Sequence, residues 1–190
     1  MRRVIGIGET ILDLLFKNNQ PTVAVPGGSV FNGLVSLGRA GAKVTFISEV
    51  GGDRVGNIIL DFMKENGICT DSVDVYPDRK SPISLAFLNE KNDAEYSFYK
   101  DYPSLRLDVD MPEVTSDDIV MFGSFYAITP QLRDKVKELL DKARKVGAII
   151  YYDVNFRSTH AHEAIKLMPT ILENFEYADI VRGSTEDFGN

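Results

Sequence analysis

Short apolar runs alternate with amphipathic stretches along most of this chain. Runs of four or five apolar residues are typical of strands buried on both faces of a parallel sheet, whereas apolar positions three or four apart indicate helices with one buried face. We predict strands at 4–8, 44–47, 119–122, 149–152 and 180–181, and helices at 32–40, 55–66, 129–146 and 163–174. Because strands alternate with helices, the pattern predicts an α/β fold built on a doubly wound, mostly parallel sheet.

Two segments interrupt this alternation. Residues 11–25 lie between a predicted strand and a predicted helix and contain two adjacent asparagines and Pro21, which favours a hairpin. Residues 81–100 carry two strand-like runs on either side of a polar turn at 89–93. We expect the two segments to form a small antiparallel sheet, a lid, that projects from the α/β core. The chain stops soon after a strand, so we expect residues 1–190 to be one domain without its C-terminal part.

Composition and charge exclude several classes of protein. The 190 residues are 44% hydrophobic, which is enough to close a core at this length. They include 21 Lys and Arg against 28 Asp and Glu, a net charge of −7, so we expect no nucleic-acid partner and no membrane partner. No apolar run approaches the ~18 residues of a membrane span and no signal-peptide cleavage site follows the start, which predicts a cytoplasmic protein. Cys69, the single cysteine, fits a reducing compartment, and we interpret it as a small apolar residue near a helix end.

The first glycine pattern gives little support to a dinucleotide site. Gly6 and Gly8 lie in the first predicted strand, but Ile11 occupies the position where a dinucleotide-binding turn has its third glycine. We interpret the two glycines as signs of close packing around the strand, and keep a nicotinamide-dependent enzyme as a minor alternative. Ser124 lacks the G-x-S-x-G spacing of a hydrolase, so the sequence does not support acyl transfer.

Carboxylates and glycines gather where the first strand ends. Ligands of open α/β sheets bind beyond the carboxyl ends of the strands, and we place Glu9 and Asp13 there. A carboxylate at this edge can accept hydrogen bonds from sugar hydroxyls, although many such groups are only solvated. Gly27 and Gly28 precede a predicted helix, so bare backbone and unpaired N–H groups can approach a ligand. Asn32 can cap that helix or bind a ligand.

A third polar group follows a predicted buried strand. Asp153, Asn155 and Arg157 occupy alternate positions and point the same way if the chain stays extended. Such a trio can order a metal–phosphate group, and the alternative is a strand-end salt bridge between Asp153 and Arg157. His160 and His162 lack the further ligands of a zinc site, and we interpret them as surface residues.

Together these motifs resemble the pfkB, or ribokinase-like, family of carbohydrate kinases. The N-terminal signature is carried by Gly27, Gly28, Asn32, Gly41 and Gly51, a V-G-x-D-x-x-G segment by 50–53 with Gly56, and a D-x-N-x-R segment by Asp153, Asn155 and Arg157. The sequence departs from the family pattern at Val30 and Leu34, and at Ser184 and Asp187, which take the outer places of an N-x-x-E motif. The second family signature, with its catalytic Asp, is absent from this sequence.

The resemblance implies a ribokinase-like fold and phosphorylation of a sugar hydroxyl, with ATP and Mg²⁺ as cofactors. It implies substrate contacts from Asp13, Gly27, Gly28, Asn32, Phe98, Lys100 and Arg157. It implies that phosphate and metal are organised by Asp153, Asn155, Ser184 and Asp187, none of them a direct metal ligand, with Arg157 as a further phosphate contact. The catalytic base is expected in the missing C-terminal third.

The identity of the sugar stays open in the sequence. Fructose fits the resemblance best, followed by 2-keto-3-deoxygluconate and ribose. The alternative function is a sugar-binding module without catalysis, because the catalytic part is missing. The partners expected from the resemblance are a small sugar and ATP, and the lid could pair across a two-fold axis to form a homodimer.

Overall fold

The computed structural model describes residues 2–90, 94–156 and 164–188. The strands are β1 (Val4–Ile7), β2 (Ile11–Lys17), β3 (Gln20–Gly27), β4 (Val44–Gly51), β5 (Ile68–Cys69), β6 (Val73–Tyr76), β7 (Ile83–Leu88), β8 (Ala94–Tyr99), β9 (Ile119–Gly123), β10 (Ile149–Asp153) and β11 (Ile180–Arg182). The helices are α1 (Ser29–Arg39), α2 (Arg54–Glu65), α3 (Arg133–Val146), α4 (Ala164–Tyr177) and α5 (Thr185–Phe188), with 3₁₀ helices η1 (Phe125–Ile128) and η2 (Pro130–Leu132). The predicted alternation of strands and helices is confirmed.

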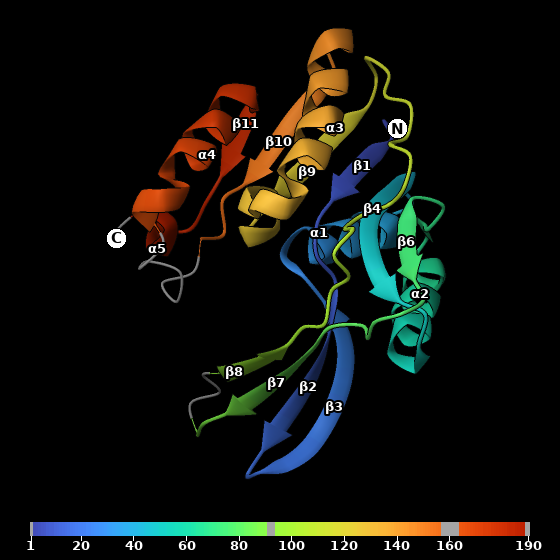
Figure 1. Ribbon diagram of the computed structural model, residues 1–190, viewed down its shortest axis with the longest axis vertical. Helices are drawn as coiled ribbons and strands as arrows, with labels where there is room; N and C mark the ends of the chain where they lie inside the picture. The colour runs from blue at the N-terminus through green and yellow to red at the C-terminus, as the bar shows by residue number, and fades with distance from the viewer. Residues whose placement is uncertain (1, 91–93, 157–163, 189–190) are drawn as a thin grey trace.

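The main sheet is parallel and has helices on both faces. Its strand order is β11-β10-β9-β1-β4-β5, and β6 pairs with a later part of β4. Figure 1 shows α3 and α4 in front of the sheet and α1 behind it. The doubly wound, mostly parallel architecture expected from the sequence is therefore confirmed.

Alternate residues of β1 pack into two different apolar cores. Ile5 and Ile7 belong to the cluster built with α3, whereas Gly6 faces α1 on the other side of the sheet. A Cβ on Gly6 would collide with the side chain of Leu34, and a Cβ on Gly8 would also lie tightly against α1. Gly6 and Gly8 therefore allow α1 to approach the sheet, which confirms the packing interpretation of this pattern.

The lid is a separate four-stranded sheet of order β3-β2-β7-β8. It projects from the core beyond the ends of the parallel strands (Figure 1). The expectation of an antiparallel lid is wrong in one respect, because β2 and β7 are parallel and only the outer pairs, β2 with β3 and β7 with β8, are antiparallel. Both hairpins leave the core in the same direction, so their first strands pair side by side and the sheet is mixed.

Several elements differ from the predicted pattern. The short strands β5 and β6 and the 3₁₀ helix η1 were not predicted, since none is long enough to show a periodicity. The helix expected from 129 begins at Arg133, after the separate turn of η2 that contains Pro130. Cys69 lies on β5 and is exposed. None of the helices in the described ranges is long and apolar enough to cross a membrane.

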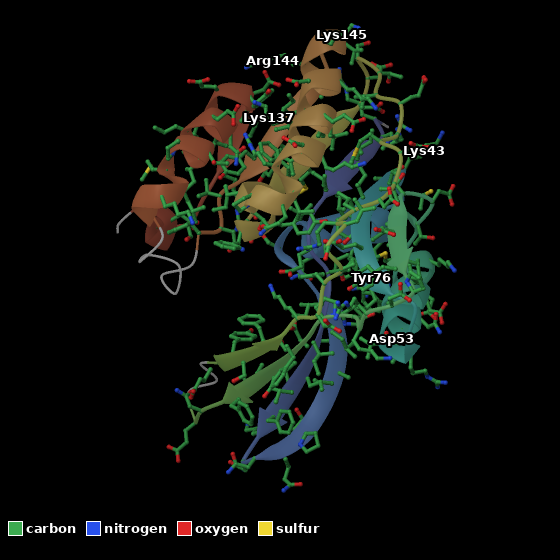
Figure 2. All side chains as sticks on the ribbon, viewed as in Figure 1. Lys43, Asp53, Tyr76, Lys137, Arg144 and Lys145 are labelled. Carbon is green, nitrogen blue, oxygen red and sulfur yellow. The ribbon has the colours of Figure 1, made fainter. Side chains whose placement is uncertain are left out.

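The V-G-x-D-x-x-G segment fixes the root of the lid. Asp53 caps α2 by accepting the N–H of Gly56 at 2.8 Å, and it also accepts the hydroxyl and the N–H of Ser81 at 2.8 and 3.1 Å. Ser81 lies two residues before β7, so one carboxylate holds both the helix start and the chain that enters the lid strand. Figure 2 shows Asp53 and Tyr76 on the side of the core formed by α2 and β6.

Candidate functional site

Asp13 lies within the lid strand β2 rather than at the end of β1. The hydroxyl of Ser84, on the neighbouring strand β7, donates a hydrogen bond to its Oδ1 atom. Burial raises the pKa of Asp13 and the nearby charge of Glu9 raises it further, while the bond from Ser84 acts in the opposite direction. A Cβ on Gly27 would collide with the Asp13 carboxylate. The carboxylate is thus packed against bare backbone at the root of the lid.

Gly28 brings the start of α1 to the same place. Its φ of +149° is disfavoured for residues with a side chain, and a Cβ there would collide with the carbonyl oxygen of Glu9. Since α1 begins at Ser29, its N-cap residue has no side chain to satisfy the first-turn N–H groups. The N–H of Asn32 donates to the Gly28 carbonyl at 2.9 Å, so Asn32 lies inside the helix and the capping role is wrong. The positive end of the α1 dipole therefore lies at the root of the lid, near Asp13.

The lid presents an aromatic side chain on the face that carries Asp13. Asp13 pairs with Ser84 and Ser84 pairs with Phe98, and directly paired residues of a sheet share a face. Phe98 is 58% exposed there. Lys100 follows β8, and its ammonium lies 2.7 Å from Oε1 of Glu9 and 5.3 Å from the centre of the Phe98 ring. The ion pair joins the lid to the end of β1.

A buried ion pair, which sequence reasoning missed, lies beneath this junction. Glu49, near the end of β4, is 2% exposed and pairs with Arg106, whose Nε lies 2.9 and 3.0 Å from the two carboxylate oxygens. The Leu107 N–H donates to the same carboxylate at 3.2 Å and the Tyr126 hydroxyl at 3.3 Å. Since each oxygen is hydrogen-bonded, the buried charge of Glu49 is compensated.

Tyr102 connects that buried pair to Glu9. The Arg106 guanidinium carbon lies 3.5 Å from the centre of the Tyr102 ring, and Tyr76 packs edge-on against the same ring at 6.5 Å. The Tyr102 hydroxyl donates to Oε1 of Glu9. Burial raises the pKa of Tyr102 and the charge of Glu9 raises it further, so the phenol keeps its proton as a donor. A continuous chain of contacts therefore joins Glu49 to Lys100 through Arg106, Tyr102 and Glu9.

Asp153 is paired with residues of two other elements, Ser29 and Arg182. Asp153 is 4% exposed, and its carboxylate accepts hydrogen bonds from Ser29 Oγ at 3.0 Å and Arg182 Nη1 at 2.9 Å. Arg157, the partner considered in the sequence, lies outside the described residues, as do His160 and His162. Asp153 therefore links the end of β10 to the start of α1 and to β11.

The chain does not stay extended after β10, so Asp153 and Asn155 do not project as alternate residues of one strand. Asn155 has a φ of +39°, and its amide Nδ2 lies 3.3 Å from the hydroxyl of Ser124, which has a φ of +58°. Two residues with positive φ thus meet at the carboxyl edge of the sheet, one after β9 and one after β10. Positive φ in residues other than glycine is uncommon and gathers at functional sites.

Ser184 and Asp187 form a small cap between two loops. The Ser184 hydroxyl and N–H donate to one Asp187 oxygen at 2.9 and 2.6 Å, as in a capping box at the start of α5. The other Asp187 oxygen accepts the N–H of Phe156 at 2.6 Å. These residues therefore hold the loop after β10 against the loop after β11.

Comparison with known proteins decides the family. The model of the pfkB family of carbohydrate kinases matches residues 1–190. This chain belongs to the pfkB family. It is 22% identical to probable fructokinase-4 and 26% identical to the chloroplastic probable fructokinase-6, both of Arabidopsis thaliana. The alignments cover 97% of this chain but 60% and 51% of those relatives, so the chain spans between half and two thirds of their length.

Solved structures confirm the ribokinase-like fold of this pfkB chain. Fructokinase of Vibrio cholerae O395, in its form with fructose, ADP and calcium bound, superposes with a TM-score of 0.83 at 20% identity over 98% of this chain and 61% of that one. An uncharacterised sugar kinase of Pyrococcus horikoshii in complex with ATP gives a TM-score of 0.75 at 23% identity over 94% and 62%. At these identities the likeness concerns the fold.

The polar residues Asp153 and Asp187 are held by hydrogen bonds to neighbouring groups. No group of three or more His, Cys, Asp or Glu suited to a metal ion occurs among the described residues. Asp153 is occupied by a hydroxyl and a guanidinium, and Asp187 by a hydroxyl and backbone N–H groups. This donor set fits an indirect role, in which carboxylates hold the groups around a metal–phosphate and do not ligate the ion themselves.

Proposed function

We propose that the complete pfkB protein transfers a phosphoryl group from ATP to a hydroxyl of a sugar, with fructose as the first candidate. The observation that carries the proposal is the meeting of Asp13, on the lid, with the glycine start of α1, on the core. A carboxylate acceptor and helix N–H donors side by side are complementary to a polyhydroxy ligand. The fructokinase relatives, and the fructose and ADP bound to one similar structure, support this choice.

Each group has a defined part in the proposed reaction. Asp13 accepts a sugar hydroxyl, the bare backbone at Gly27 and Gly28 lets the ring approach, and Phe98 covers it from the lid. Bound ATP with Mg²⁺ would supply the phosphoryl group and neutralise its charge. Such transfer depends mainly on alignment, and a lid over the sugar excludes competing water. We assign Arg157, outside the described residues, to a phosphate or to an acid group on the sugar.

The organisation of the phosphate side is also proposed from these contacts. Asp153 and Asn155 lie at the end of β10, Asp153 joined to the start of α1, while Ser184 and Asp187 hold the neighbouring loop. Their hydrogen bonds fix the carboxyl edge of the sheet against the helix start. We infer that this rigid edge positions ATP and its metal relative to the sugar hydroxyl.

A panel of sugars tests the proposed activity. The complete protein is incubated with ATP, Mg²⁺ and, separately, fructose, ribose, 2-keto-3-deoxygluconate or a nucleoside, while ADP release is followed. We expect ADP above background with one of these sugars, fructose first. No ADP with any of them, from protein that melts cooperatively, would refute the kinase assignment.

For the 190 residues alone, the alternative is sugar binding without turnover. The residues assigned here bind or position groups, and we expect the catalytic base in sequence beyond them. Calorimetry on this chain should then detect saturable sugar binding. Tight ATP binding without sugar binding would contradict this alternative.

We also propose a homodimer through the lid and a cytoplasmic location. Exposed apolar side chains, among them Val23, Tyr96 and Phe98, follow the lid face that carries Asp13, which supports pairing with a second copy. The net charge of −7 argues against nucleic acid and anionic membranes as partners. Light scattering at several concentrations checks the dimer.

Replacing Asp13 with Asn should raise the KM for the sugar without changing the KM for ATP. The loss of a charge-assisted hydrogen bond is worth about 1.5–3 kcal/mol, or roughly 10-fold to 100-fold in KM. The control is Asp141→Asn, on the exposed face of α3. An unchanged sugar KM in the Asp13 variant would remove this carboxylate from the site.

The raised pKa of Asp13 predicts a pH dependence with a definite sign. Because burial raises the pKa above its ordinary 3.8, the folded protein holds the proton more tightly than the unfolded chain does. Ionised Asp13 therefore lowers stability as the pH rises from 3.8 through the folded pKa. Sugar binding, which needs the carboxylate, should weaken as the pH falls through that raised value. A KM–pH profile should show this acidic limb in wild type, and Asp13→Asn should lack it.

A further inference from the structure

The carboxylate of Glu9 is the point where lid and core meet. Lys100, from the lid, lies 2.7 Å from Oε1, and the Tyr102 hydroxyl donates to the same oxygen. The backbone carbonyl oxygen of Glu9 lies so close to Gly28 that a Cβ on Gly28 would collide with it. Glu9 therefore belongs to the same cluster as Gly28 and, through its charge, Asp13.

Tyr102 holds Glu9 from a rigid base. The Arg106 guanidinium carbon lies 3.5 Å from the centre of the Tyr102 ring, and the Tyr76 ring packs against it in a T-shaped arrangement with the ring centres 6.5 Å apart. Arg106 in turn is fixed by its buried pair with Glu49. A hydroxyl on so constrained a ring keeps one carboxylate oxygen in a fixed place, which is the condition for a preorganised binding group.

Glu9 also decides which charge the lid junction offers to a ligand. Lys100 is 34% exposed and would attract an anionic substrate, but its ammonium is already neutralised by Glu9. Asp13 adds a further carboxylate nearby, and the Phe98 ring below Lys100 is apolar. The described groups at this junction therefore suit a neutral ligand with many hydroxyls and disfavour one with a carboxylate.

We propose that Glu9 is a specificity-determining residue that selects a neutral sugar over a sugar acid, and that Tyr102 is the residue that positions it. This inference rests on the proposed sugar kinase activity and deepens it by naming the substrate class. Glu9 acts in two ways, by accepting hydrogen bonds from sugar hydroxyls and by occupying Lys100. Tyr102 contributes only to the first, because its removal leaves both charges in place.

The test compares two variants of the complete protein on two sugars. Glu9→Gln, Tyr102→Phe and wild type are assayed with fructose and with 2-keto-3-deoxygluconate, and the KM for ATP and the melting temperature are measured in parallel. Tyr177→Phe is the matched control, because it removes a similar tyrosine–carboxylate bond, to Asp141 at 2.6 Å, far from the lid.

Glu9→Gln should change the preference between the two sugars, whereas Tyr102→Phe should change only the affinity. Glu9→Gln frees Lys100, so kcat/KM for the sugar acid relative to fructose should rise about tenfold. Tyr102→Phe should raise the KM for both sugars about tenfold, because Glu9 accepts hydroxyls of either, so this ratio and the KM for ATP stay unchanged. Tyr177→Phe should change none of these quantities.

Three other outcomes would each overturn one element of the proposal. An active wild type whose sugar ratio is unchanged by Glu9→Gln overturns the specificity role. A Tyr102→Phe variant that melts lower but keeps its fructose KM has a structural role only, which overturns positioning. A wild type inactive on every sugar overturns the proposed kinase activity, and this inference with it.

Discussion

Replacing Arg106 with Met should lower the free energy of unfolding by about 3–5 kcal/mol. The substitution keeps much of the apolar stem but leaves the carboxylate of Glu49 buried, at 2% exposure, without its cation. The remaining donors, from Leu107 and Tyr126, cannot compensate a full charge. Urea unfolding of the complete protein measures the effect, provided that wild type and variant have the same m-value.

An exposed ion pair provides the control for this loss. Arg79 and Asp101 are 3.3 Å apart, with side chains 50% and 49% exposed, so Arg79→Met should cost at most about 1 kcal/mol. If Arg106→Met also lowers the free energy of unfolding by less than about 1 kcal/mol, the buried pair of Arg106 and Glu49 does not stabilise the lid junction.

Replacing Gly28 with Val should lower sugar-dependent turnover by about 100-fold or more while the protein still folds. The φ of +149° strains any side chain, at a cost of ~1–3 kcal/mol, and the new Cβ would also collide with the Glu9 carbonyl. The start of α1 must then move away from Asp13. A displacement of about 1 Å in a positioning group is enough to lower the rate by about 100-fold. Steady-state kinetics with the preferred sugar measure the loss.

Gly41→Ala separates backbone strain from the close approach. Gly41 also has a positive φ, +83°, but nothing lies within 4 Å of its Cβ position. This variant should lose some stability and keep its kcat/KM. If Gly28→Val is as active as Gly41→Ala, the start of α1 does not contact the sugar.

The alternation of apolar and amphipathic segments was sufficient to predict the core, because each strand and helix owes its pattern to its own burial. The same alternation could not predict that β2 and β7 run parallel. Pairing between the lid hairpins depends on where the core releases them, and no local pattern records that. Asn32 was misjudged because the helix start depends on Gly28, whose need for glycine comes from contact with Glu9.

Candidate site residues could be proposed from the sequence where they lie in short motifs, and not where they depend on distant contacts. Gly28 and Asp153 were proposed from a glycine pair and a strand end, whereas Asp13, expected at the end of the first strand, lies within the lid strand β2. Glu49 and Arg106 were missed because 57 positions separate them, and a charged residue in a strand pattern looks like a solvated one. Only the three-dimensional structure shows that this glutamate is buried.

Phosphoryl transfer to a sugar is tested most directly by identifying the product of the reaction. The complete protein is incubated with ATP, Mg²⁺ and fructose, and sugar phosphate and ADP are quantified together by mass spectrometry. We predict equal amounts of sugar phosphate and ADP, and neither without the sugar. ADP without sugar phosphate, or no product from folded protein with any sugar of the panel, would contradict the assignment.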